Sequence, residues 1–154
     1  MAEVKRARFA AEIVGLVGLI GSLGFVGMEI RQNTTAVRSA TIQAVADQTM
    51  DLTLSMATDD RLPQLVYEMT QNGVVRAELG AADFMRLNLV VVAGLRRQEN
   101  LFLQVKSGVL QEESLGNVSF GFYQNAFVRE YWAINRGLFD QGFAEYWDVI
   151  LSDP

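Results

Sequence analysis

The side chains of this sequence that could carry out chemistry are carboxylates and guanidinium groups, because the chain has no histidine and no cysteine. A Ser-His-Asp triad, a thiolate nucleophile, a histidine or cysteine zinc site and a Glu-x-x-His di-iron site are therefore excluded. The candidate carboxylate pairs are Asp59 with Asp60, Glu112 with Glu113, and Asp47 with Asp51. Two carboxylates without further oxygen ligands make a weak cation site, and solvated helix faces explain the pairs better. We expect no catalytic residue, no metal and no cofactor.

A second group of polar side chains lies within one expected helix. Its members are Asn88, Arg96, Arg97, Glu99, Asn100 and Gln104. Residues 96, 100 and 104 share one helical face, and this row predicts a buried polar network that fixes helix register. Binding of an anionic headgroup or a small ligand by Arg96 or Arg97 is an alternative, and simple solvated charge is another. The spacing of Glu99 from both arginines is poor, so we expect their carboxylate partner elsewhere in the fold.

Aromatic residues gather in the C-terminal part of the chain, between residues 120 and 147. Tyr131, Trp132, Tyr146 and Trp147 are expected to pack the last helices onto the core. They are also candidates for an interfacial belt at the depth of lipid headgroups, where tyrosine and tryptophan are enriched, or for an exposed partner surface.

The elements that must position these groups are limited by composition. The chain has 154 residues, of which 50% are hydrophobic and 20% charged, with a formal net charge of −5. This length suits one domain with a real core. An acidic chain offers no basic patch to displace counterions from a phosphate backbone, so we expect no nucleic-acid partner.

The most informative segment is residues 10–30, whose uncharged centre runs from Ile13 to Met28 between Glu12 and Glu29. As a helix it rises roughly 31 Å, close to the roughly 30 Å of a bilayer core. We interpret it as a transmembrane helix; a buried helix of a soluble bundle and a cleaved signal peptide are the alternatives. Three basic residues precede the span and two follow it, which gives a slight preference for a cytoplasmic N-terminus.

Glycine recurs every three residues along this span, a pattern that would be costly in water at about 1 kcal/mol per residue. In lipid, small residues let helix backbones approach closely, so the pattern favours helix packing. The residues expected to serve that packing are Ala11, Gly15, Gly18, Gly21, Ser22, Gly24 and Gly27. Drift of glycine in a tolerant lipid span is the alternative.

The rest of the chain shows helical periodicity and no strand alternation. Asn33 to Thr35 are read as a cap or kink, after which Val45, Leu52 and Met56 share one side of a helix. The expected helices then span about 63–72, 81–107, a short segment opening near 109–113, 120–136 and 141–151.

Three segments carry a resemblance to a known family. They are the glycine-rich span running into MEIRQNTTAVRSAT, the stretch RRQENLFLQVKSGVLQEES, and the aromatic end REYWAINRGLFDQGFAEYWD. Together they resemble a family of small bacterial proteins with no established activity. The resemblance covers nearly the whole chain and implies an N-terminal membrane helix followed by a compact helical domain. It implies no catalytic residue.

The sequence thus predicts an all-α protein of the bacterial inner membrane, with a membrane segment over 1–30 and a small helical bundle over 31–154. We expect contact with membrane lipid and a non-catalytic role as an accessory or assembly subunit, which docks its glycine-lined helix on another membrane protein. A homo-oligomer or pore made of copies of the same helix is the second hypothesis. A membrane-tethered enzyme that uses carboxylates and arginine is the third.

Overall fold

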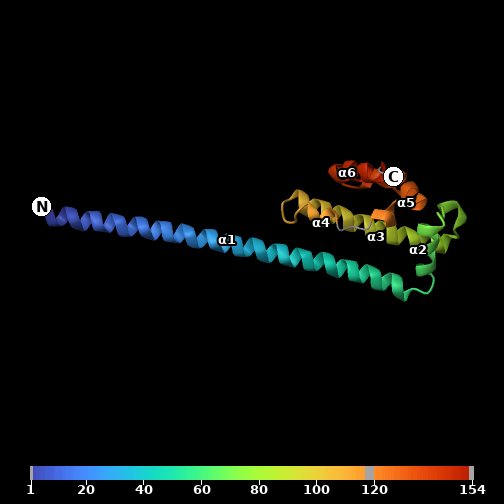
Figure 1. Cartoon of the computed structure of the whole chain (residues 1–154), viewed down its shortest axis with the longest axis horizontal. Coiled ribbons are helices and arrows are strands. Elements are labelled where there is room, and N and C mark those ends of the chain that lie inside the picture. The colour runs from blue at the N-terminus through green and yellow to red at the C-terminus, as the bar shows by residue number, and fades with distance from the viewer. Residues whose placement is uncertain (1, 117–119, 153–154) are drawn as a thin grey trace. The chain divides into compact units, whose positions relative to one another are not determined.

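The structure is a computed structural model that describes residues 2–116 and 120–152, apart from the side chains of residues 2–4, 7, 8, 10, 11, 116 and 120. It divides into two compact units, Met1–Ala40 and Thr41–Pro154. The described residues form helices and no strand, which confirms the all-α prediction (Figure 1). The main helices are α1 (Ala2–Thr58), α2 (Leu62–Gln71), α3 (Ala81–Lys106), α4 (Glu113–Gly116), α5 (Ala126–Asn135) and α6 (Gln141–Ser152).

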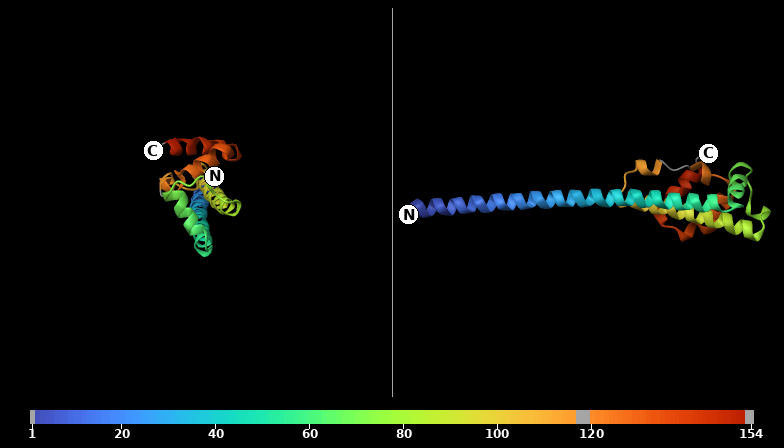
Figure 2. Two further views of the ribbon diagram at one scale, coloured as in Figure 1. Left: turned by 90° about the vertical axis from the view of Figure 1, so that its right-hand side faces the viewer. Right: turned by 90° about the horizontal axis from the view of Figure 1, so that it is seen from below.

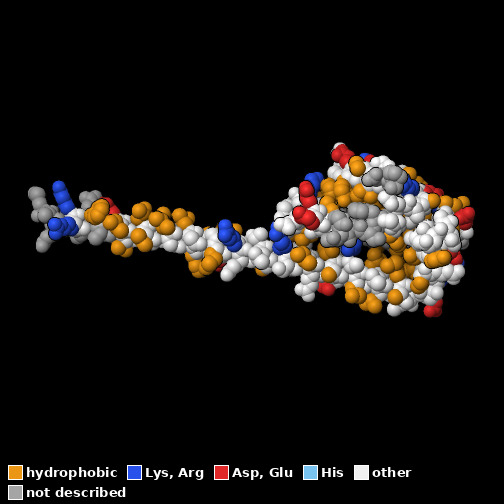
Figure 3. Space-filling model, viewed as in Figure 1, with side chains coloured by type: hydrophobic (Ala, Val, Ile, Leu, Met, Phe, Trp, Pro, Cys, Tyr) orange, Lys and Arg blue, Asp and Glu red, His pale blue; other side chains and the backbone are white. Residues whose placement is uncertain are grey.

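The first unit is the N-terminal part of α1. Residues 12–58 contain a window of mean hydropathy 2.0, none of which is buried in the structure. This helix is long and apolar enough to cross a membrane, a property shared by core helices of soluble proteins and by signal sequences. Figure 3 shows hydrophobic side chains along this part of α1, between basic side chains at either end.

The expected cap at residues 33–35 is wrong, because α1 continues unbroken through them, while the alternative of a kink stays a prediction. The hydroxyl of Thr34 donates to the carbonyl of Ile30 at 2.9 Å, and that of Thr35 donates to the carbonyl of Arg31 at 3.0 Å. A threonine hydroxyl that bonds back by one turn satisfies itself within a helix and does not end it.

Local signals set the bounds of α2 and α3 as the sequence predicts. Oδ1 of Asp59 accepts hydrogen bonds from the backbone N–H groups of Arg61 and Leu62, both at 2.8 Å. The helix that begins there ends before Gly73, which has φ +68°, and α3 ends before Gly108, with φ +76°. Glycine takes this left-handed conformation without a Cβ penalty, so both helices stop where the sequence provides one.

The expected continuous helix over 120–136 is wrong. A 3₁₀ turn, Phe120–Tyr123, comes first, and α5 begins only at Ala126. The side chain of Asn125 accepts a hydrogen bond from the backbone N–H of Val128 at 3.0 Å, which caps α5 at that point. A second 3₁₀ turn, Arg136–Leu138, then links α5 to α6.

The core of the second unit lies where α2, α5 and α6 meet α3 (Figure 2). Its fully buried large side chains are Leu65, Met69, Leu87, Val91, Leu95, Val128, Phe143 and Trp147. One face of α1 is half-buried, that of Val45, Leu52 and Met56, and Met56 packs against the core. The C-terminal part of α1 therefore belongs to the same unit as α3.

Candidate functional site

The structure separates the predicted polar network into several environments. Asn88 lies beside Arg76 and Glu130, in a small cavity between α3 and α5. Gln104 contributes its backbone carbonyl, which accepts from the N–H groups of Val109 and Leu110 where α3 ends. Arg96 and Glu99 form one cluster with the start of α6, and Arg97 and Asn100 line a cleft beside α1.

The cluster around Glu99 joins α3 to α6. Nη1 of Arg96 lies 2.7 Å from one carboxylate oxygen of Glu99, and the other oxygen accepts the backbone N–H of Asp140 at 2.6 Å. Arg96 also donates to the carbonyl of Leu138 at 3.1 Å, and its guanidinium lies over the ring of Phe139, 4.3 Å from the centroid. The expectation that the partner of Arg96 lies elsewhere in the fold is therefore wrong, since the i,i+3 spacing suffices.

The next residue, Arg97, has a different environment. Its side chain is half-buried, and its Nε atom is buried with no hydrogen-bond acceptor in the described part of the chain. Burial raises the pKa of the Tyr123 hydroxyl above its usual value, and the positive charge of Arg97 acts in the opposite direction, lowering this pKa. Arg97 thus brings charge close to the core without an observed hydrogen-bond or ion-pair partner among the described residues.

The cleft beside Arg97 lies wholly within the second unit and has a volume of about 480 Å³. We call it the α1–α3 cleft. Its lining residues are Gln48, Asp51, Leu52 and Ser55 of α1 and Ala93, Arg96, Arg97 and Asn100 of α3. Asp51 is exposed on its helix face and also lines this cleft.

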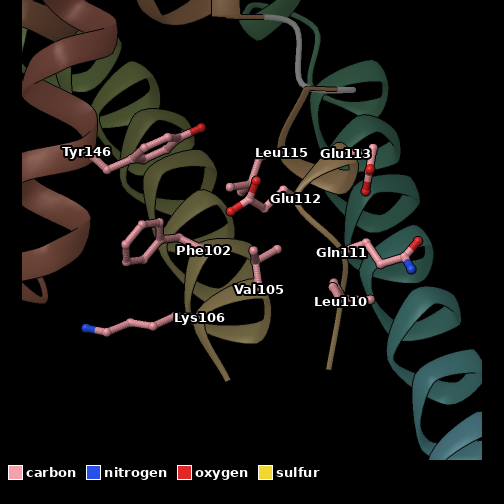
Figure 4. A pocket seen from close by; sticks show the side chains of 9 residues that line it. All are labelled: Phe102, Val105, Lys106, Leu110, Gln111, Glu112, Glu113, Leu115 and Tyr146. Carbon is pink, nitrogen blue, oxygen red and sulfur yellow. The ribbon is translucent and has the colours of Figure 1, made fainter. Parts of the chain in front are cut away.

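A larger hollow of about 920 Å³ lies between α3, α4 and α6. Phe102 of α3 and Tyr146 of α6 stack there with ring centroids 5.2 Å apart, beside Leu115, as Figure 4 shows. Lys106 points away from Leu115 in that view and pairs with Asp140 at 3.7 Å. Gln111, Glu112 and Glu113 are exposed at this hollow, so its lining combines apolar and polar side chains.

The aromatic residues pack mainly inside the second unit. Trp132 and Trp147 are 4% and 0% exposed, and their rings lie against Phe143. Tyr131 and Tyr146 are partly buried against the same core. The two tryptophans, at least, are covered by protein and have no surface left for lipid headgroups.

The five glycines of the apolar segment have open space where a Cβ would stand, with no atom within 4 Å. Ser22 is exposed and donates its hydroxyl to the carbonyl of Leu19 at 2.8 Å, and the side chain of Ala11 lies outside the described residues. The glycine positions are Gly15, Gly18, Gly21, Gly24 and Gly27. Space around these glycines is available for a second helix.

The described residues contain no group of three or more carboxylates placed to hold a metal ion. Sequence reasoning located the arginines and Asn100 on α3 but missed the contribution of Gln48, Asp51 and Ser55, because that contribution depends on how α1 and α3 lie together. A helix spacing of 48, 51 and 55 was the available signal, since these positions share one face.

No family model, curated protein or solved structure matches the chain, so the family resemblance stays a prediction.

Proposed function

We propose that the chain is a single-pass membrane protein whose apolar helix docks on another membrane protein, and that it serves as an accessory or assembly subunit without catalytic activity. The observation that carries the proposal is an apolar helical segment with none of its hydropathy window buried. Val14, Leu16 and Leu23 are 72%, 60% and 64% exposed. Side chains of this kind cost free energy in water, at roughly 25 cal/mol per Å² of apolar surface, and a bilayer removes that cost.

The glycine pattern supports a helix partner within the bilayer. Lipid chains are as apolar as leucine, so helices associate there through close packing, which small residues permit. No described atom of the first unit lies within 4 Å of a Cβ built on any of the five glycines. A partner helix would therefore find a surface on which backbones approach closely, and the remaining residues, proposed to form a helical bundle, would add contacts outside the bilayer.

A homo-oligomer of the same helix is the second candidate, and the same glycines support it. A water-filled pore receives less support, because Ser22 is the polar residue between Ile13 and Met28 and its hydroxyl is already bonded to Leu19. A conducting lumen needs polar side chains or carbonyls that face water. We place the protein in a bacterial inner membrane with its N-terminus in the cytoplasm, following the basic residues on either side of the span.

The experiment is native mass spectrometry of complexes extracted from the membrane in nanodiscs, for the wild-type chain and for Gly18→Leu and Gly21→Leu. The expected result is a stoichiometric complex with another membrane protein that both substitutions dissociate, with membrane insertion intact. Ile20→Leu is the matched control, because it changes the shape of one side chain on the same segment without adding a side chain at a glycine position. A ring or dimer of this chain alone would favour the second candidate, and a monomer would contradict both.

A further inference from the structure

Five polar side chains that line the α1–α3 cleft make no side-chain hydrogen bond within the described residues; those from α1 are exposed to water and those from α3 are half-buried. Three come from α1 and two from α3, so both walls contribute. They are Gln48, Asp51, Ser55, Arg97 and Asn100. Polar side chains that converge on one concave space, with no partners of their own, are the usual means by which a pocket orients a ligand.

Two guanidinium groups line the cleft, and that of Arg97 is the one without an observed partner among the described residues. Within the described residues, no carboxylate oxygen lies within 4.0 Å of its guanidinium, and its Nε atom is buried without an acceptor. Its neighbour Arg96, by contrast, is held by Glu99, Leu138 and Phe139. A partly buried guanidinium without an acceptor carries a desolvation cost that an oxyanion would relieve through a two-pronged hydrogen bond. Asn100, one turn further along α3, supplies an amide donor on the same wall.

Asp51 is the negative group on the opposite wall. It makes no ion pair with Arg97 in the structure, although both side chains line the same space. A simple anion at Arg97 would be repelled by Asp51, and a simple cation at Asp51 would be repelled by Arg97. The charge arrangement therefore disfavours an ion with only a positive or only a negative charge, and favours a molecule that carries one charge of each sign.

From this geometry we propose that the α1–α3 cleft binds a small zwitterion of the α-amino acid class. The carboxylate of the ligand pairs with Arg97 and Asn100, and its ammonium group pairs with Asp51. Gln48 and Ser55 offer an amide and a hydroxyl to the remaining polar atoms. A volume of about 480 Å³ accommodates such a molecule and lies in the range of ordinary ligand pockets, roughly 300–1,000 Å³.

The test measures binding to the full-length chain in nanodiscs by isothermal titration calorimetry with each of the twenty common α-amino acids. Each amino acid is matched with its decarboxylated amine and its N-acetyl derivative, which lack one of the two charges. We expect at least one amino acid to bind at least tenfold more tightly than both matched compounds. Arg97→Gln and Asp51→Asn should each weaken that binding tenfold or more, and Arg97→Lys should weaken it less than Arg97→Gln because it keeps the charge.

Asp47→Asn is the matched control, since Asp47 is exposed one turn before Asp51 and does not line the cleft. The Asp47→Asn variant should bind the amino acid with the same affinity as the wild-type chain. Circular dichroism of each variant checks that the helices are intact, which is expected because neither Arg97 nor Asp51 has an ion pair to lose. The proposal is overturned if no amino acid binds better than its matched compounds, or if the binding survives both Arg97→Gln and Asp51→Asn. A zwitterionic phospholipid of the nanodisc that occupies the cleft and is not displaced by any free amino acid would also overturn the proposal, in favour of a lipid headgroup.

Discussion

The hydroxyl of Tyr123 occupies the space in which a side chain at Gly94 would begin. A Cβ built on Gly94 would lie 2.6 Å from Oη of Tyr123, 3.0 Å from Cε1 and 3.2 Å from Cζ. Tyr123 is 6% exposed and packs edge-on against Trp147, with ring centroids 5.3 Å apart. The ring therefore cannot withdraw without disturbing the core, and the absence of a side chain at Gly94 is what allows α3 to approach it.

Gly94→Ala should destabilise the chain although the same change stabilises most helices. Alanine gains about 1 kcal/mol over glycine in a helix interior, whereas overpacking a core costs about 1–3 kcal/mol. We expect a net loss of the free energy of unfolding, measured by chemical denaturation of the full chain in detergent. Tyr123→Phe should recover part of that loss in the double variant, because it removes the closest atom. Additive effects of the two changes would contradict a direct contact.

Glu99→Gln should lower the free energy of unfolding by about 1–3 kcal/mol, the usual worth of a hydrogen bond to a charged group. Glu99 has a side chain only 12% exposed and joins Arg96 to the N–H of Asp140, so its loss loosens α6 from α3. Glu112→Gln is the control, because Glu112 is exposed and makes no ion pair in the described structure. Equal stability of the two variants, measured by the same denaturation, would show that the Glu99 cluster does not hold the helices together.

Asp59→Ala should lower the melting temperature, because it leaves two backbone N–H groups at the start of α2 without their acceptor. Oδ1 of Asp59 accepts two backbone N–H groups at the start of α2, and Oδ2 lies 3.4 Å from Nε of Arg86. Asp60→Ala changes the adjacent, exposed aspartate and should have little effect. Thermal unfolding followed by circular dichroism distinguishes the two variants, and a larger loss in Asp60→Ala would contradict the role of Asp59.

The protein should lose stability in acid. The hydrogen bond from Arg136 lowers the pKa of Asp148 below its usual value, and the one from Trp132 adds to this. Backbone N–H groups lower the pKa of Asp140 and that of Asp59. A carboxyl group whose folded pKa is lowered stabilises the fold above its unfolded pKa, and this contribution disappears as pH falls through the folded pKa.

The melting temperature should therefore be steady above about pH 5 and fall below about pH 4. Asp148→Asn should melt at a lower temperature than the wild type at neutral pH, because it loses the ion pair with Arg136 at 2.7 Å. The difference between the two proteins should shrink as the pH falls, because protonation of the wild-type carboxylate removes its ion pair. A difference that is independent of pH would contradict the electrostatic explanation.

The sequence was sufficient to predict the parts of the fold that depend on local signals. Asp59, Pro63 and Gly73 bound α2, and Gly108 ends α3, through backbone chemistry within a few residues. The division of the segment before α5 was not predictable in the same way. Asn125 caps α5 through a local bond, but Tyr123 in the 3₁₀ turn before it lies against Gly94, about thirty positions earlier in the chain.

The candidate site shows the same limit. Periodicity placed Arg97 and Asn100 on one helix, but a spacing rule cannot tell which arginine has a partner. Arg96 finds Glu99 on its own helix, and Glu99 in turn reaches Asp140 on another. Asp51 and Arg97 line the same cleft only because α1 and α3 lie together; the spacing of residues 48, 51 and 55 indicates a shared helix face but not which helix it meets.

The burial of both tryptophans gives the chain an intrinsic optical reporter. Trp132 and Trp147 are the only tryptophans in the sequence, and both lie in the core of the second unit. Trp132 donates its indole N–H to Asp148 at 2.8 Å. Exposure of α5 and α6 to water would therefore change the polarity of the surroundings of this indole. Residues 1–40 contain no tryptophan. Fluorescence emission therefore follows the folded state of the second unit alone, and the unit's stability can be read in a bilayer without a signal from the apolar helix.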